Sequence, residues 1–183
     1  EIALLEDMHT ALTRGEFQLY SQPKVHAGSH KLVGAEALLR WLHKEHGIIA
    51  PDKFLDLALR HDIIKPITKW VVRTAVYRLA RWPDQLSISV NLAPAVLLDD
   101  DILSVVTDAL MSCDVSPSRL NLEVTERIMS DSHEIVLSQL AKLQAIGVRI
   151  SIDDFGTGIT SLASFRNLPI NREQRRGVPE TGR

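Results

Sequence analysis

The segment Leu120–Glu126 reads LNLEVTE, and apolar and polar residues alternate over its first six positions. Neighbouring side chains of a β-strand point to opposite faces of the sheet. Asn121, Glu123 and Thr125 would therefore share one face, with the apolar residues on the other. The segment predicts a strand that packs on one side and presents polar groups, including a carboxylate, on the other.

Three further segments show strand patterns that place a carboxylate or an amide on the polar face. They are Leu86–Asn91 (LSISVN), Val148–Asp153 (VRISID) and Lys31–Trp41 (KLVGAEALLRW). If the strands lie side by side, four oxygen-bearing side chains converge near one end of the sheet: Glu36, Asn91, Glu123 and Asp153. Such oxygens suit hard cations, so the sequence predicts a site for divalent metal ions there.

The composition indicates one soluble domain with a substantial core. The chain has 183 residues, of which 45% are hydrophobic and 24% charged, with a net charge of −2. That charge supplies no basic surface for the phosphates of a nucleic-acid polymer, so we exclude such a partner.

The lone Cys113 fits a reducing compartment. No run approaches the roughly 18 apolar residues of a membrane span, and the start at Glu1 suggests a chain that begins inside a longer protein.

Strands and helices alternate along the chain. Apolar periodicity and end signals predict helices over 2–14, 51–61, 64–82, 94–113 and 131–147, and strands over 17–25, 31–41, 86–91, 120–126 and 148–153. This order predicts an α/β fold with a mostly parallel sheet. Both an open doubly wound sheet and a (β/α)8 TIM-type barrel are compatible with it. Polar faces on several strands favour the barrel, whose catalytic groups lie at the carboxyl ends of its strands.

Five short motifs, in order and compatibly spaced, resemble those of the EAL domain family. They are Tyr20–Lys24 (YSQPK), Glu36–Trp41 (EALLRW), Ser89–Leu92 (SVNL), Leu122–Glu126 (LEVTE) and Asp153–Gly158 (DDFGTG). The resemblance extends over residues 2–170. It implies a (β/α)8-type EAL barrel and the activity of bacterial cyclic di-GMP phosphodiesterases, which open cyclic di-GMP to linear pGpG with Mg²⁺ or Mn²⁺.

The resemblance assigns metal-binding roles to five residues. Glu36, Asn91, Glu123 and Asp153 match the ligands of a first ion, and Asp153 bridges to a second ion held by Asp154. Two ions about 3.5–4 Å apart can ionise a water and stabilise both the attacking and the leaving oxygen of a phosphodiester.

Other matched residues concern the substrate and the assembly. Gln22 matches a residue that contacts the dinucleotide, and Arg40 one that contacts its phosphate. The loop Phe155-Gly156-Thr157-Gly158 matches a segment that links metal binding to dimerisation. Glu126 is a second candidate ligand, but register with the family favours Glu123 and gives Glu126 a supporting position behind it.

Each of these residues has a plainer interpretation when it is taken alone. A strand-end carboxylate is more often a cap or a surface group, Asp153-Asp154 could begin a turn, and Arg40 could be a solvated charge. The shared face and the shared order favour the site. His43 and His46 are spaced as metal ligands are, but they fall in a loop of the family, so we expect them at the surface.

The end of the chain departs from the family pattern. Position 174, where the resemblance places a lysine that positions the attacking water, holds Gln174. Residues 171–183 contain almost no apolar side chains, so we expect an irregular tail there. The remaining residues, 1–170, are then a partial EAL domain with about five of the eight barrel strands.

Two functions of different class follow. The first is a phosphodiesterase domain that hydrolyses cyclic di-GMP and is impaired in this shortened chain. The alternative is a non-catalytic EAL remnant that binds cyclic di-GMP or a protein. The resemblance implies the bacterial cytoplasm, with membrane attachment only through a flanking segment. It leaves open a homodimer and flanking sensory or GGDEF domains in a parent protein.

Overall fold

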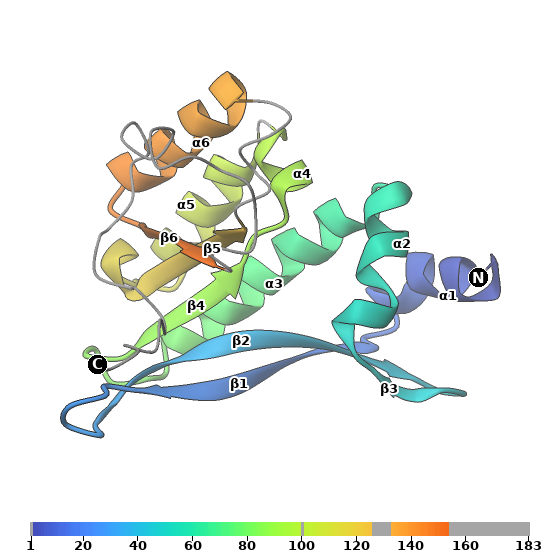
Figure 1. Cartoon of the computed structure of the whole chain (residues 1–183), viewed down its shortest axis with the longest axis horizontal. Coiled ribbons are helices and arrows are strands. Elements are labelled where there is room, and N and C mark those ends of the chain that lie inside the picture. The colour runs from blue at the N-terminus through green and yellow to red at the C-terminus, as the bar shows by residue number, and fades with distance from the viewer. Residues whose placement is uncertain (1, 100, 126–132, 154–183) are drawn as a thin grey trace, which may run out of the picture.

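The computed structural model describes residues 2–99, 101–125 and 133–153 (Figure 1). The α-helices in these ranges are α1 (Ile2–Ala11), α2 (Leu55–Arg60), α3 (Ile64–Leu79), α4 (Pro94–Leu97), α5 (Ile102–Ser112) and α6 (His133–Ala145). The strands are β1 (Phe17–Val25), β2 (Leu32–His43), β3 (Gly47–Ile49), β4 (Ser87–Asn91), β5 (Leu120–Thr125) and β6 (Arg149–Asp153). Short 3-10 helices, Pro51–Lys53 and Pro117–Arg119, precede α2 and β5.

The strands form one sheet in the order β1-β2-β4-β5-β6, and β3 pairs with the end of β2. β1 and β2 form a long antiparallel hairpin, whereas β2, β4, β5 and β6 run parallel to one another. Figure 1 shows the hairpin along one side of the molecule, with the parallel strands and helices α3, α5 and α6 beyond it. The α/β fold with a mostly parallel sheet is therefore confirmed, and the described strands do not close into a barrel.

One face of the parallel strands packs against the helices. Five apolar positions of the alternating pattern are at most 1% exposed: Ile88, Val90, Leu120, Leu122 and Ile150. They share a core with the buried face of α3, which includes Ile67, Val72 and Val76. Full burial of each such side chain contributes about 1.5–3 kcal/mol relative to an exposed one. This packing fixes the parity of each strand and therefore assigns the other face to the polar residues.

The helix predicted over 94–113 is wrong in one respect, because α4 and α5 are separate helices. The break carries acidic side chains that bind across to α3. Lys69 Nζ lies 2.9 Å from Asp99 Oδ2 and 2.7 Å from Asp101 Oδ2. Asp is a weaker helix former than most residues, and the break lies at two Asp residues whose carboxylates both bind Lys69.

The strand β3 was not predicted. Gly47–Ile49 folds back onto β2, with Ile49 opposite Trp41 and Gly47 opposite His43. Three residues are too few for an alternation pattern, and Gly47 takes a positive φ of 66° that forms the turn.

The expectation of a surface position is wrong for His43. The strand β2 extends to His43, and the His43 side chain is buried, with its Nε2 3.2 Å from Asp7 Oδ2 of α1. His43 therefore fixes the first helix to the hairpin, while His46 is exposed and stacks on its ring.

None of the helices in the described ranges has the length and apolarity needed to cross a membrane.

Candidate functional site

The parallel strands carry polar residues on the face away from the helices. Across the sheet, Glu36 of β2 pairs with Ser89 of β4, and Asn91 of β4 pairs with Glu123 of β5. Glu123 in turn pairs with Ser151 of β6. Paired residues in neighbouring strands lie on the same face, so these side chains form one polar surface, with Asn91 at the carboxyl end of β4.

Three of the four predicted first-ion ligands come together on this surface. The Asn91 amide Nδ2 donates to Glu36 Oε1 at 3.1 Å, and Glu123 lies directly opposite Asn91 in the ladder. Because the amide nitrogen of Asn91 is used on Glu36, its carbonyl oxygen is the atom able to face a cation. Their role as metal ligands stays a prediction.

A buried hydrogen-bond network surrounds Glu123. Asn121 Nδ2 donates to Ser151 Oγ at 2.8 Å, Ser89 Oγ at 3.1 Å and Glu123 Oε1 at 3.3 Å. Lys24 of the hairpin also donates, to Ser89 Oγ and to Glu123 Oε1 at 2.7 Å. One carboxylate oxygen of Glu123 is therefore held by two donors.

The other oxygen of Glu123 provides the test of whether a cation fits here. Glu123 is only 5% exposed, and its Oε2 has no hydrogen-bond partner among the described residues. A buried carboxylate oxygen without a partner is costly, because it has lost its hydration and gained nothing in exchange. A divalent cation would supply the missing partner, so the donor set fits a hard metal ion.

The remaining predicted ligands are only partly described. Asp153 is the last residue of β6 and pairs with Thr125. The Asp153 side chain, Asp154, Glu126, the Phe155–Gly158 loop and Gln174 lie outside the described residues, as does the tail predicted after residue 170. In the described part of the chain, no three His, Cys, Asp or Glu side chains gather into a metal-binding group. A complete ion site would therefore need the Asn91 oxygen and ligands beyond this part.

The two predicted substrate contacts lie on strands that border the polar surface. Gln22 of β1 pairs with Glu36, and a hollow of about 270 Å³ is lined by residues 22–25 together with Glu36. Arg40 lies further along β2, on the same face as Glu36 by strand alternation. Its Nη1 donates to Leu39 O at 2.7 Å, and its guanidinium lies 5.9 Å from the Tyr20 ring centroid.

Sequence reasoning gave Lys24, Ser89, Asn121 and Ser151 no role in the site. The alternation of apolar and polar residues places Ser89 and Asn121 on the polar face, so the sequence pattern indicates that these two residues lie near the site. Lys24 falls in the YSQPK motif, two positions from Gln22, and therefore on the same face. Its contact with Glu123 joins residues 99 positions apart and has no local signal.

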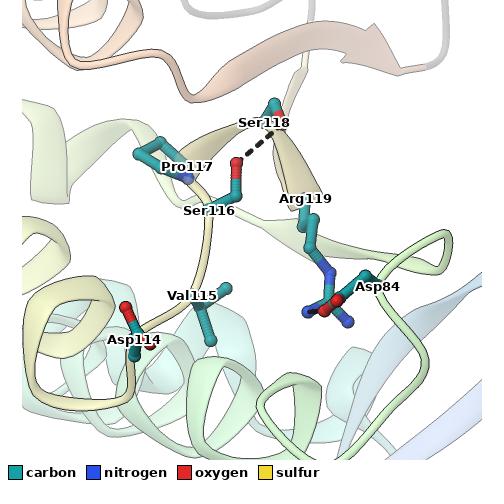
Figure 2. Close-up of a pocket in the computed structure, with 7 residues that line it drawn as sticks. All are labelled: Asp84, Asp114, Val115, Ser116, Pro117, Ser118 and Arg119. Atoms are coloured by element: carbon teal, nitrogen blue, oxygen red, sulfur yellow. Dashed lines mark hydrogen bonds and ion pairs between the residues drawn. The ribbon is translucent and has the colours of Figure 1, made fainter.

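Another hollow, of about 530 Å³, lies at the opposite end of the strands, before β4 and β5 (Figure 2). The Arg119 side chain lines it beside Asp84, and its guanidinium donates to Asp84 Oδ1 and to the backbone oxygens of Leu79, Trp82, Pro83 and Leu86, all at 3.0–3.1 Å. The Ser116 and Ser118 hydroxyls bond each other. Because the donors of Arg119 are used within the chain, we assign this hollow a structural role.

Comparison with known proteins agrees with this picture. A model of the EAL domain family matches residues 5–172. The chain is 40% identical over 173 residues to the bifunctional diguanylate cyclase/cyclic di-GMP phosphodiesterase MucR of Pseudomonas aeruginosa, a match that covers 92% of this chain and 25% of MucR. It is 33% identical over 171 residues to another cyclic di-GMP phosphodiesterase of that organism, covering 91% of this chain and 29% of that protein.

Solved structures are similar as well. The MucR phosphodiesterase in complex with c-di-GMP superimposes with a TM-score of 0.86 at 40% identity, and the match covers 92% of this chain and 70% of that one. The EAL enzyme Bd1971, in a form with cAMP and cyclic di-GMP bound, gives a TM-score of 0.85 at 31% identity, covering 92% of this chain and 48% of that one. The chain spans between a fifth and a quarter of the length of the first three curated relatives it matches.

Proposed function

Because the chain belongs to the EAL domain family, we propose that it is a cyclic di-GMP phosphodiesterase domain that binds the dinucleotide over a divalent metal site and opens it to linear pGpG. The relatives and solved structures described above, which carry this activity or this ligand in their names, support the proposal. We further propose that the domain acts in the bacterial cytoplasm beside flanking domains of a longer protein. A homodimer is part of this proposal, and sedimentation of the purified chain would test it.

One observation supports the proposal more than any other. Glu123 is a buried carboxylate beside Asn91 and Glu36, and its Oε2 has no hydrogen-bond partner in the described part of the chain. A purely structural carboxylate at this depth would have both oxygens satisfied. The open oxygen on a polar surface is the arrangement that a metal-dependent site requires.

Each residue then has a task. Glu36, Asn91, Glu123, Asp153 and Asp154 would hold Mg²⁺ or Mn²⁺. When bound, the metal supplies charge that lowers the pKa of a water and neutralises the phosphate oxygens.

Two residues beside the metal set would orient the substrate. Arg40 would hold a phosphate through its planar guanidinium, whose paired N–H groups match two phosphate oxygens. Gln22 would contact the dinucleotide from the neighbouring strand. Together they would align the scissile phosphodiester with the metal site.

We expect negligible turnover from the 183-residue chain by itself. Position 174 carries Gln174 where the resemblance places a lysine that positions the attacking water. Each 1.4 kcal/mol lost from transition-state stabilisation is about a tenfold loss in rate. The alternative function, a non-catalytic module that binds cyclic di-GMP or a protein, draws its support from this substitution.

A paired measurement of binding and turnover tests both functions. Calorimetric titration of cyclic di-GMP in Mg²⁺ should give binding by the wild-type chain and at least about a tenfold loss in Arg40→Ala, because a charge-assisted pair to phosphate is removed. Arg73→Ala, at an exposed position of α3, is the control. Absence of dinucleotide binding by the wild-type chain would contradict the proposal.

Chromatographic detection of pGpG separates the two functions. We expect negligible product from the unmodified chain and recovered product when a family carboxyl-terminal third is joined after Ile170. Binding without turnover in both forms would favour the non-catalytic module.

Metal titration tests the ligand assignment by itself. Asp153→Asn should weaken Mn²⁺ binding more than Glu126→Gln, because the first is assigned to the metal ions and the second to a position behind them. An equal or reversed order would contradict the register that places Glu123, and not Glu126, at the metal.

A further inference from the structure

The ammonium of Lys24 lies against the carboxylate of the candidate metal site. Its Nζ is 2.7 Å from Glu123 Oε1, and it also donates to Ser89 Oγ. Both charged side chains are largely buried, with 14% of the Lys24 side chain and 5% of the Glu123 side chain exposed. Water therefore screens these two charges little. Each of them acts strongly on a cation that comes close to it.

Lys24 reaches the site from the hairpin. Lys24 lies on β1 opposite Gly34 of β2, and Ser89 and Glu123 belong to the next two strands, β4 and β5. The long Lys24 side chain extends over β2 and reaches Ser89 of β4 and Glu123 of β5. The hairpin thus supplies a positive charge to a site built on the parallel strands.

The two carboxylate oxygens of Glu123 differ in their hydrogen bonding. Oε1 accepts from Lys24 and from Asn121 Nδ2 at 3.3 Å, whereas Oε2 has no hydrogen-bond partner in the described part of the chain. Lys24 therefore fixes the orientation of the carboxylate through one oxygen and neutralises its charge. The other oxygen stays available to a ligand.

We propose that Lys24 is a positioning residue that sets the cation affinity of this site. This inference rests on the proposed function for the presence of a metal site. A bound cation and the Lys24 ammonium repel each other across one carboxylate, so binding must displace the ammonium or overcome its charge. A monovalent ion gains little over the ammonium already present, whereas a divalent ion carries twice the charge. A divalent ion can therefore displace the ammonium from Glu123, whereas K⁺ or Na⁺ does not.

Direct measurement of Mn²⁺ binding tests the proposal. Free Mn²⁺ is followed by electron paramagnetic resonance in titrations of the wild-type chain, Lys24→Met and Lys24→Arg. Removal of the positive charge should tighten Mn²⁺ binding at least about tenfold in Lys24→Met, and the arginine variant, which keeps the charge, should stay within about twofold of wild type. Lys31→Met, the control, removes an exposed lysine of the hairpin turn and should leave the Mn²⁺ affinity unchanged.

A second measurement uses the unmodified chain and needs no folded variant. The acetylation rate of Lys24 by an amine-reactive reagent is followed by mass spectrometry, with the exposed Lys31 as the internal standard. The Lys24 amine should react slowly without metal and at least about threefold faster with saturating Mn²⁺, because the ion takes over its partner Glu123. K⁺ at the same ionic strength should leave the rate unchanged.

The outcomes separate this inference from the proposed function. Mn²⁺ affinity that is equal or weaker in Lys24→Met, or Lys24 reactivity that does not respond to Mn²⁺, overturns the role of Lys24. If cyclic di-GMP does not bind but Lys24→Met still tightens Mn²⁺, the proposed function fails and the role of Lys24 stands. If the dinucleotide binds but Mn²⁺ affinity is indifferent to Lys24, only the inference fails.

Discussion

Two buried charges lie four positions apart, one just before the strand β5 and one in its second half. Arg119 precedes the strand and is 8% exposed, and Glu123 lies within it and is 5% exposed. Arg119 donates to four backbone oxygens and to Asp84, so the chain itself satisfies this charge. Glu123 is satisfied on one oxygen only. The difference fits a structural role for the charge before β5 and supports the proposal that the charge within β5 serves a ligand.

Substitution of Arg119 should have the largest effect on stability. Arg119→Met removes the donors for four carbonyl groups that are then left in place, and we expect a loss of about 3 kcal/mol in the free energy of unfolding. Urea denaturation followed by circular dichroism measures it. Asp84→Asn is the matched control: because the Asp84 side chain is fully exposed, the ion pair itself should contribute no measurable stability. A large loss in the control with a small loss at Arg119 would reverse the assignment.

Gly34→Ala should have the next largest effect and tests close packing near the amino end of β4. A Cβ at Gly34 would lie 2.1 Å from Ser87 O, a backbone atom that cannot move by itself. Separating β2 from β4 to relieve the overlap should cost about 2–3 kcal/mol, measured by the same denaturation. At Gly28 the nearest atom to an added Cβ is His26 Cε1 at 3.5 Å, so Gly28→Ala should be nearly neutral. Equal stability of the two variants would show that β2 and β4 are less tightly held than described.

The sequence predicted the sheet well because its signal is local. Alternation in residues 86–91 and 120–126 reflects one face packed against helices, and burial of Ile88, Val90 and Leu122 agrees with it. The same parity places Glu123 opposite Asn91. The polar face therefore follows from the two-residue alternation in the strands, and the fold class follows from the order of strands and helices.

Features that depend on contacts between distant residues could not be predicted in this way. The break between α4 and α5 lies where Asp99 and Asp101 bind Lys69, about thirty positions earlier. His43 is buried and contacts Asp7 of α1, which lies 36 positions earlier. Arg119 and Lys24 likewise bind partners that no spacing rule connects. Charged residues look alike in sequence whether water or the chain satisfies them.

Glu123→Gln tests whether the second charge of this comparison, Glu123, serves a ligand. The amide keeps the shape, and its oxygen can still accept from Lys24, but the charge that Lys24 and a metal ion share is lost. We therefore expect at least a tenfold loss of Mn²⁺ affinity and a stability loss of about 1 kcal/mol. Metal titration and urea denaturation give the two numbers. Glu45→Gln, at an exposed position after β2, is the control. A stability loss as large as that of Arg119→Met, without loss of metal binding, would make Glu123 a second structural charge and remove the contrast between the two charges.

The smallest effect is expected at Lys69, whose ion pairs lie partly in solvent between α3 and the α4–α5 break. Burial alone would lower the pKa of Lys69, but hydrogen bonds to Asp101 and Asp99 outweigh it and raise that pKa above its ordinary value of 10.5. The hydrogen bond from Lys69 likewise lowers the pKa of Asp99 below 3.8.

These shifts predict how stability depends on pH. The stability that the Asp99 charge contributes is present above pH 3.8 and disappears as the pH falls through the lowered pKa. The stability that the Lys69 charge contributes disappears as the pH rises through the raised pKa. Lys69→Met should cost about 0.5–1 kcal/mol near neutral pH, and this difference from wild type should shrink towards acid and towards strong alkali. Urea denaturation across the pH range measures it, and a difference that stays constant with pH would mean that Lys69 stabilises the break by packing its aliphatic chain and not by charge.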